Sequence, residues 1–245
     1  MSIKDEKSKT PEFTKDNLND YLKELGKEFR KRNGKTTPAE IILIGGAAVL
    51  ANYGFRDMTT DMDAIISASS AMKEAISAVA DKYNLPFDWL NTDFKRTESY
   101  SYKLVEHSSY YKTFANILVI RTIKAEYLVA MKLMAGRIYK KDLSDIIGIC
   151  MEESNAGNPI TYEAVDKAML ELYGGWDKVE PEAIKVLNQA LQGENLQYYY
   201  DDKRQWEREN KEKLIEFGGK PSDLFKEDNF EYVISEAERI KNQQQ

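Results

Sequence analysis

The sequence predicts an α/β (α+β) fold, in which a mixed sheet flanked by helices is followed by a helical C-terminal part. Two observations indicate this fold. Up to about residue 122, short apolar runs typical of strands alternate with stretches in which apolar residues recur at helical spacing. After Lys124, the patterns are helical. Because no Pro/Gly-rich linker separates the two parts, we expect them to pack as one body.

The expected elements follow the chain in order. We divide it into a flexible N-terminus (1–15), a sheet domain (16–122) and a helical C-terminal region (123–245). In the sheet domain, we expect helices over 16–32, 47–53 and 70–83, the last capped by Ser69 or Ser70, and strands over 41–44, 62–66, 85–94, 102–106 and 114–120. In the C-terminal region, we expect helices over 125–137, 142–153, 163–175, 181–192 and 223–241, with a long polar segment over 197–216.

Composition excludes several classes of protein. The net charge of −6 argues against a general nucleic-acid coat protein, although a local basic groove remains compatible with it. One cysteine, Cys150, rules out an internal disulfide, and with the single His107 it leaves no set of ligands for structural zinc. The longest apolar run, 41–51, is too short to span a bilayer. We therefore expect a cytoplasmic protein with no membrane partner.

A glycine pair and an aspartate pair form the first candidate site. Gly45-Gly46 separates a strand from a helix, where glycine lets the backbone approach a phosphate and helix N–H groups point at it. Asp61 and Asp63 are two residues apart in a β-like run, so their carboxylates should project from one face and attract a divalent cation. The alternatives are an ordinary turn glycine pair and two solvated aspartates.

The second candidate site lies in the segment MKLMAGRIYKKDLSDI. Lys132 stands in an apolar run, where a charge must be paired or functional; the alternative is that it extends its ammonium group to solvent. Arg137 follows it. Asp142 could be catalytic or the N-cap of a helix, with Asp145 favouring the helix dipole.

Four segments together carry a family resemblance: Gly45-Gly46, Arg56…Thr60-Asp61-Met62-Asp63, Asp88-Trp89-Leu90-Asn91, and the pattern K-L-x-A-x-R-x3-K-D-x2-D that begins at Lys132. They resemble the polymerase-β-like nucleotidyltransferase superfamily over about residues 38–150. Within it, the chain is similar to the bacterial DUF6036 and AbiEii-type toxin-like nucleotidyltransferases.

The resemblance implies a nucleotidyltransferase fold and a role for each matched residue. Many members carry a third metal-binding carboxylate on a later strand, but the matching strand here has Asn116, and Asp88 is the candidate substitute. The implied metal ligands are Asp61 and Asp63, holding Mg²⁺ or Mn²⁺; the implied nucleotide-binding residues are Gly45, Gly46, Arg56, Thr60 and Arg137; and the implied catalytic residues are Asp61, Asp63, Lys132, Asp142 and Asp145.

The function expected from this is metal-dependent transfer of a nucleoside monophosphate from an NTP to an acceptor hydroxyl. The resemblance implies an RNA end or a protein as acceptor, and a toxin of a toxin–antitoxin or phage-defence system with an antitoxin or regulatory protein as partner. The alternative is a catalytically weak nucleotide-binding or regulatory protein. A purely structural helical adaptor would leave the aspartate pair unexplained.

Two further clusters could bind a ligand or be purely structural. The segment 198–206 (YYYDDKRQW) combines aromatic and basic residues that could stack on single-stranded RNA, but a solvated helix with a partly buried aromatic stripe is the favoured interpretation. Basic residues between Lys27 and Lys35 form a positive patch at the end of the first helix. We expect His107 to be structural or exposed, and Cys150 to lie in the core.

Overall fold

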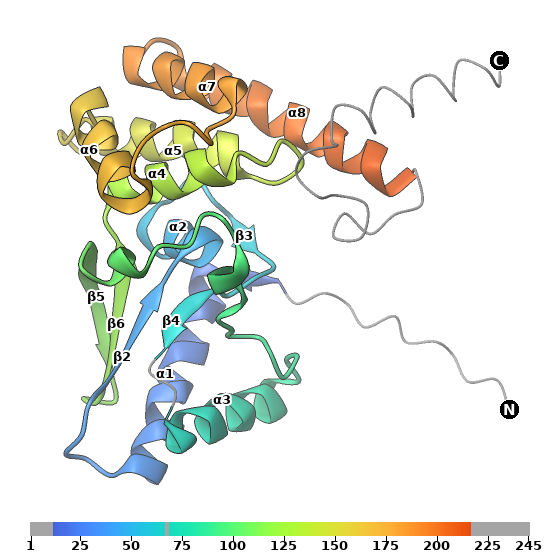
Figure 1. Ribbon diagram of the computed structural model, residues 1–245. Helices are drawn as coiled ribbons and strands as arrows, with labels where there is room; N and C mark the ends of the chain where they lie inside the picture. The colour runs from blue at the N-terminus through green and yellow to red at the C-terminus, as the bar shows by residue number, and fades with distance from the viewer. Residues whose placement is uncertain (1–11, 67–68, 217–245) are drawn as a thin grey trace, which may run out of the picture.

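The computed structural model describes residues 12–66 and 69–216, and it confirms a mixed α and β architecture (Figure 1). A four-stranded sheet has the order β4-β2-β6-β5. In this sheet β2 is parallel to β6, whereas β4 pairs with β2 and β5 pairs with β6 in antiparallel fashion. The four strands are β2 (Ala39–Leu43), β4 (Ala64–Ile66), β5 (Ser108–Phe114) and β6 (Leu118–Ile123).

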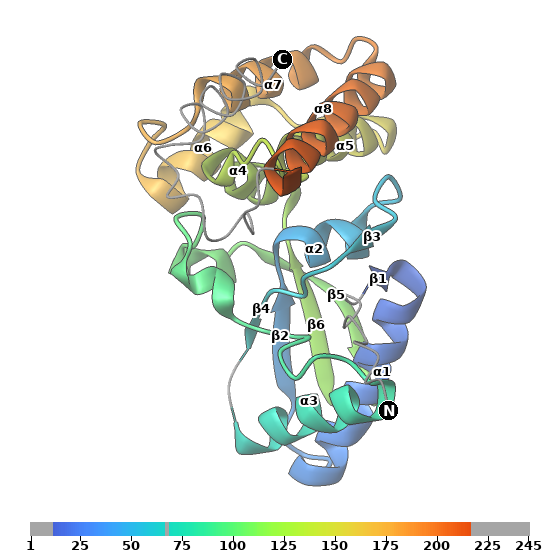
Figure 2. The same cartoon turned by 90° about the vertical axis from the view of Figure 1, so that its right-hand side faces the viewer.

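Helices cover the sheet and its upper end. Figures 1 and 2 show α1 (Lys15–Asn33) and α3 (Ser70–Tyr83) beside the lower part of the sheet, and α2 (Gly45–Asn52) at the end where β2 finishes. The remaining helices form a layer above that end: α4 (Ala125–Ala135), α5 (Asp142–Asn155), α6 (Tyr162–Tyr173), α7 (Pro181–Gln192) and α8 (Leu196–Glu216).

The N-terminal segment is ordered closer to the chain start than expected. Phe13 is fully buried, and strand β1 (Phe13–Thr14) pairs with β3 (Met58–Thr59). Thr14 and Asn17 then form a capping box that starts α1, each side chain bonding to the other residue's backbone N–H. Residues 13–15 are therefore not frayed, and residues 1–11 lie outside the described part.

Several sequence-based element predictions were confirmed and others were wrong. The helices over 16–32, 47–53 and 70–83 match α1, α2 and α3, and Ser69 is the N-cap of α3. The segment 102–106 forms a 3₁₀ turn (Tyr102–Val105) rather than a strand, because its Lys103 docks on α6 by donating to the Glu171 carbonyl. Tertiary contacts here override β propensity.

Three more boundaries differ from the prediction. The segment 85–94, predicted as a strand, forms only an isolated β-bridge between Asn91 and Asp63, and a 3₁₀ turn follows at Asp93–Arg96. The strand predicted over 114–120 is a hairpin of β5 and β6, turned by Ala115 and Asn116 in left-handed conformations. The polar segment 197–216 is the long helix α8. The helix predicted over 223–241 lies outside the described residues.

Hydrogen bonds near α6 and near α5 tie the helical layer to the sheet part. Near α6, the Tyr173 hydroxyl donates to the Ser99 carbonyl over 2.8 Å. Near α5, the Glu152 carboxylate accepts from the backbone N–H groups of Gly54 and Phe55, at 2.8 Å and 2.7 Å. A single cluster of buried apolar residues also includes side chains from both parts. Among the described helices, none has the length and apolar character needed to cross a bilayer.

The close packing of α5 against the Phe55 side chain gives a stability prediction. A Cβ added at Gly148 would lie 2.5 Å from the Phe55 ring. We therefore expect Gly148→Ala to lower the free energy of unfolding by about 1–3 kcal/mol through overpacking, measured by urea denaturation. In a Phe55→Ala background the same change should be neutral or stabilising, because alanine favours the helix once the ring is gone. Equal destabilisation in both backgrounds would contradict the packing argument.

Candidate active site

The glycine pair lies where β2 ends and α2 begins, at the upper end of the sheet. Gly45 has φ +52°, a left-handed conformation that favours glycine. Ile44 occupies the N-cap of α2, and its hydrocarbon side chain cannot accept a hydrogen bond from the first turn of the helix. The N-cap side chain therefore accepts no hydrogen bond from the first N–H groups of α2. An anion at the start of this helix would accept bonds from those groups.

Gly46 is required for a second reason, which the sequence did not reveal. A Cβ at this position would lie 2.6 Å from the Thr59 hydroxyl and 2.8 Å from a guanidinium nitrogen of Arg56. The Arg56 guanidinium is held there by the Met58 carbonyl at 3.2 Å and by the Thr59 hydroxyl at 3.4 Å. The second glycine thus makes room for an arginine against the start of α2.

The aspartate pair lies beside the glycines but mostly outside a strand. Because β4 begins at Ala64, the prediction that both aspartates sit within a strand was wrong: Asp61 precedes it and is exposed, while Asp63 is half-buried and forms a single bridge with Asn91. A Cβ on Gly45 would lie 4.0 Å from an Asp63 carboxylate oxygen. The carboxylate therefore faces the start of α2.

The carboxylate of Asp63 responds to the charges around it. Burial raises the pKa of Asp63 above its ordinary value, and the negative charges of Asp61 and Asp93 raise it further. Arg137 and Lys140 oppose this rise. A cation placed between Asp61 and Asp63 would relieve their repulsion.

A buried charge network lies opposite the aspartate pair, where α4 ends and α5 begins. The Lys132 ammonium bonds to Asp142 and Asp145, each at 2.8 Å. Arg137 bonds to Asp142 at 2.7 Å, and Arg56 pairs with Asp145. We call these five residues the charge network. It joins the segment after α2 to two helices of the upper layer.

The network favours ionised forms in spite of burial. Burial alone would disfavour a charged Lys132, but Asp142 and Asp145 outweigh it and raise the lysine pKa. Burial likewise opposes the Asp142 charge, yet Lys132 and Arg137 hold the pKa of its carboxyl well below the usual range. Three cations thus face two carboxylates, which leaves one excess positive charge beside the aspartate pair.

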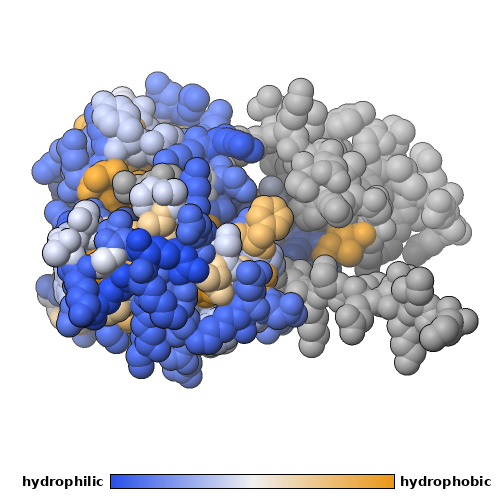
Figure 3. Space-filling model, turned by 90° about the horizontal axis from the view of Figure 1, so that it is seen from below, coloured by the Kyte–Doolittle hydropathy of each residue, from blue (hydrophilic) through white to orange (hydrophobic). Residues whose placement is uncertain are grey.

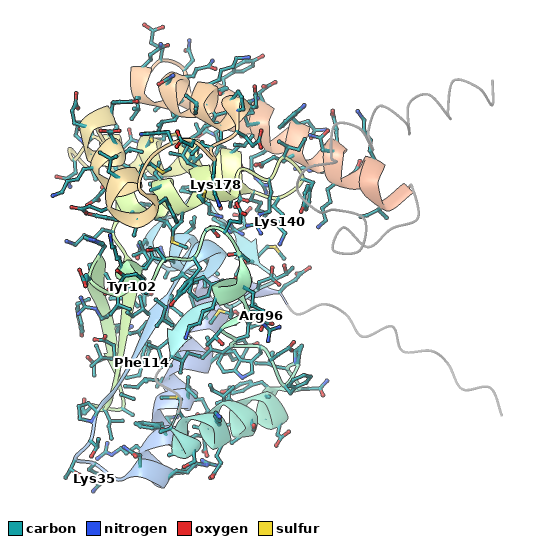
Figure 4. The ribbon with its side chains drawn as sticks, in the orientation of Figure 1. Lys35, Arg96, Tyr102, Phe114, Lys140 and Lys178 are labelled. Atoms are coloured by element: carbon teal, nitrogen blue, oxygen red, sulfur yellow. The ribbon has the colours of Figure 1, made fainter. Side chains whose placement is uncertain are left out.

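Exposure separates the cations that could reach a ligand from those that are enclosed. The side chain of Lys132 is 7% exposed, whereas that of Arg137 is 28% exposed. Lys140 is exposed, and Figure 4 places it at the junction between the upper helices and the region of α2 and β3. Burial around the amine and repulsion from Arg137 lower the pKa of Lys140, while the charges of Asp61 and Asp63 oppose that shift. Arg137 and Lys140 therefore face the aspartate pair.

With this geometry in place, a comparison with family models decides the family. A model described as "Nucleotidyltransferase of unknown function (DUF6036)" matches residues 20–171, more than half of the chain. The chain belongs to the DUF6036 family. Searches of curated proteins and of solved structures returned no significant match.

The DUF6036 match contains every residue proposed for the site from sequence, and the structure shows how they lie. One end of the sheet brings together Gly45, Asp63 and the charge network, which includes Arg137. Thr60 is exposed next to Asp61. Two alternatives for single residues were wrong. Lys132 does not extend to solvent, and Asp142 is not an N-cap, because Lys141 occupies that position of α5.

The structure places Asn116, which stands at the missing third carboxylate position, away from the site. Asn116 turns the β5–β6 hairpin at the opposite end of the sheet, since β2 and β6 run parallel and the site lies where they end. Asp88 is exposed in a turn, and its neighbour Trp89 is a core residue. Besides Asp61, the acid whose charge raises the pKa of Asp63 is Asp93, which follows the bridging Asn91 by two residues.

The donor set fits a hard cation that arrives with a ligand. Asp61 and Asp63 offer carboxylate oxygens, which suit Mg²⁺, and Mg²⁺ is commonly held by one or two carboxylates plus substrate phosphates and water. Across residues 12–66 and 69–216, no group of three or more His, Cys, Asp or Glu residues is arranged to hold a metal ion. These residues therefore suit a metal–nucleotide complex better than a metal held by protein ligands alone.

The other sequence-predicted clusters are mainly structural. In 198–206, Tyr199 is buried, the Tyr200 hydroxyl donates to the Phe55 carbonyl, and Lys203 lies over the Trp206 ring, which favours the stripe interpretation. Tyr198 is exposed. Cys150 is buried, as expected.

The basic patch at the end of α1 is largely neutralised. Lys27 pairs with Glu24 at 3.1 Å, and Lys31 and Arg32 both pair with Glu28. Figure 3, which views this end of the molecule, shows a mostly hydrophilic face. His107 stacks on Tyr127 with ring centroids 3.7 Å apart, which is a structural role.

The charge network predicts that Lys132 is essential for folding stability. Lys132→Met would leave Asp142 and Asp145 buried with one cation fewer, so we expect it to lower the free energy of unfolding by about 3–5 kcal/mol at neutral pH, measured by urea denaturation. Lys140→Met is the matched control; its side chain is exposed, so we expect a change within about 0.5 kcal/mol. A Lys132→Met protein as stable as the wild type would contradict the enclosed position of the ammonium group.

Proposed function

We propose that the protein transfers a nucleoside monophosphate from an NTP to an acceptor hydroxyl in a metal-dependent reaction that releases pyrophosphate. The observation that carries the proposal is the meeting of three features at one end of the sheet: the start of α2 at Gly45, the carboxylate pair, and a charge network with one excess positive charge. Membership of a nucleotidyltransferase family supports the same reaction class.

Each group has a role in this proposal. Asp61 and Asp63 would hold Mg²⁺, or Mn²⁺ in its place, which when bound neutralises the triphosphate and helps to align it. The N–H groups at Gly45 and Gly46 bind a phosphate, and Arg137 and Lys140 balance the charge that develops on the phosphate oxygens. The acceptor oxygen attacks the α-phosphorus, the bond from this phosphorus to the bridging oxygen breaks, pyrophosphate leaves and the hydroxyl proton passes to solvent.

In this proposal two residues, Asp142 and Asp145, have supporting roles rather than contact with the substrate. Asp142 is 1% exposed, and the depressed pKa of its carboxyl makes it a poor proton acceptor. Asp145 is equally buried and paired with two cations. We therefore assign Asp142 and Asp145 to holding Arg137, Lys132 and Arg56 in place. Thr60 keeps a proposed nucleotide contact, because it is exposed next to Asp61.

The acceptor and the biological setting rest on the family resemblance alone. We propose an RNA end or a protein hydroxyl as acceptor. We also propose the toxin of a toxin–antitoxin or phage-defence system as the setting, with an antitoxin or regulatory protein as partner.

One observation favours a second candidate, a nucleotide-binding protein with weak catalysis. No cluster of three metal-binding carboxylates occurs in the described part of the chain. The two candidates differ in one result: both bind a metal–NTP complex, but the first also transfers label from an NTP to an acceptor.

Binding and chemistry can be tested at the aspartate pair. An NTP and Mg²⁺ together should raise the melting temperature more than either does alone, because each completes the binding site of the other. Asp63→Asn and Asp61→Asn should each remove this joint stabilisation and abolish transfer while the protein stays folded, since the change relieves like-charge repulsion. Thermal shift, circular dichroism and transfer of labelled nucleotide measure these outcomes.

Asp81→Asn is the matched control, and it should behave as the wild type because Asp81 is exposed on α3, beside the lower part of the sheet. Absence of joint stabilisation with all four NTPs would count against both candidates. A folded Asp61→Asn/Asp63→Asn double variant that still transfers nucleotide would place the chemistry elsewhere.

A further inference from the structure

Helix α8 contacts three segments that carry site residues, although it lies outside residues 20–171 matched by the family model. Its Tyr200 hydroxyl donates to the Phe55 carbonyl at 3.1 Å, next to Arg56. Its Asn210 side chain donates to the Ile138 carbonyl at 3.2 Å, next to Arg137. Its Glu207 contacts the first turn of α5.

Glu207 is the buried centre of these contacts. One carboxyl oxygen accepts from the backbone N–H groups of Leu143 at 2.9 Å and Ser144 at 3.2 Å, and the other accepts from the Ser144 hydroxyl at 2.6 Å. The N-cap of α5 is Lys141, whose ammonium cannot accept these bonds. The start of α5 is therefore completed by a side chain from another helix, 63 residues away from Ser144.

The two residues that Glu207 holds stand between the carboxylates of the charge network. Asp142 precedes Leu143, and Asp145 follows Ser144. The position of this single turn sets where both carboxylates point, and so where Arg56, Lys132 and Arg137 are held. A shift of the turn would move the Arg137 guanidinium relative to Asp63.

The surroundings of Glu207 favour the neutral form of its carboxyl. Burial raises the pKa of its carboxyl to about 8, with the charges of Asp142 and Asp145 adding to the rise and the Ser144 bonds opposing it. On its own helix Arg204 lies 3.9 Å from the carboxyl. A carboxyl that stays largely neutral near pH 7 can keep its hydrogen bonds without adding a negative charge to the network.

We propose that Glu207 of α8 is a positioning residue for nucleotidyl transfer, holding the first turn of α5 so that the charge network presents Arg137 to the nucleotide. This inference rests on the proposed function. It assigns the C-terminal helix a part in the site, acting through α5 rather than by contact with substrate.

The test compares Glu207→Ala, Glu207→Gln and the control Glu209→Ala, a change of an exposed residue on the same helix. Transfer from labelled NTP with Mg²⁺ is measured as kcat and KM, each per folded molecule as determined by circular dichroism at the assay temperature. For Glu207→Ala we expect kcat to fall about 10- to 100-fold with a smaller change in KM, since small misplacements of charge-stabilising groups have effects of this size. Glu207→Gln should restore most of kcat, because the amide oxygen can accept the two backbone bonds while the amide nitrogen donates to the Ser144 hydroxyl. Glu209→Ala should match the wild type.

Ser144→Ala serves if Glu207→Ala does not fold. It removes one of the three bonds, so we expect the protein to fold and kcat to fall less than a folded Glu207→Ala protein would show. Wild-type kcat per folded molecule in Glu207→Ala, or in Ser144→Ala where the first variant is unfolded, would overturn the positioning role while leaving the proposed function intact. Absence of transfer by the wild-type protein with all four NTPs would instead overturn the proposed function, and the positioning role with it.

Discussion

The ammonium group of Lys132, enclosed between Asp142 and Asp145, is the interaction on which the site depends. A buried charge without its partner is costly, so none of the five residues of the charge network can move independently. Through Arg56 the network fixes the segment that packs against Gly46, and through Arg137 it fixes one of the cations whose charge acts on Asp63. One buried lysine thereby sets the distance between the upper helices and the glycine and aspartate pairs.

The parts of the fold that could be predicted from sequence are those decided by local pattern. The period of apolar residues located α1 and α3, and Ser69 marked the start of α3. The glycine and aspartate pairs could be singled out from sequence for the same reason, because each is a short local pattern. The segments 85–94 and 102–106 were wrong because docking on other elements, as in the bond from Lys103 to the Glu171 carbonyl, decides their conformation.

The parts of the site that sequence could not predict depend on contacts between distant segments. The sequence marks Lys132 as an unusual charge, but its pairing with Asp142 and Asp145 depends on how α4 and α5 pack. Glu207 gave no signal, because a glutamate on a polar helix is common and its target lies in another helix. The steric need for Gly46 could not be predicted either, because it depends on where the side chains of Arg56 and Thr59 lie in the fold.

The most direct test of nucleotidyl transfer compares two labels on one NTP, incubated with the wild-type protein, Mg²⁺ and a cell lysate. The account predicts that label on the α-phosphate is incorporated into an acceptor macromolecule, while label on the γ-phosphate is released in pyrophosphate. Incorporation from the γ-position would show phosphoryl transfer instead. That result, or the absence of incorporation from either position with all four NTPs, would contradict the account.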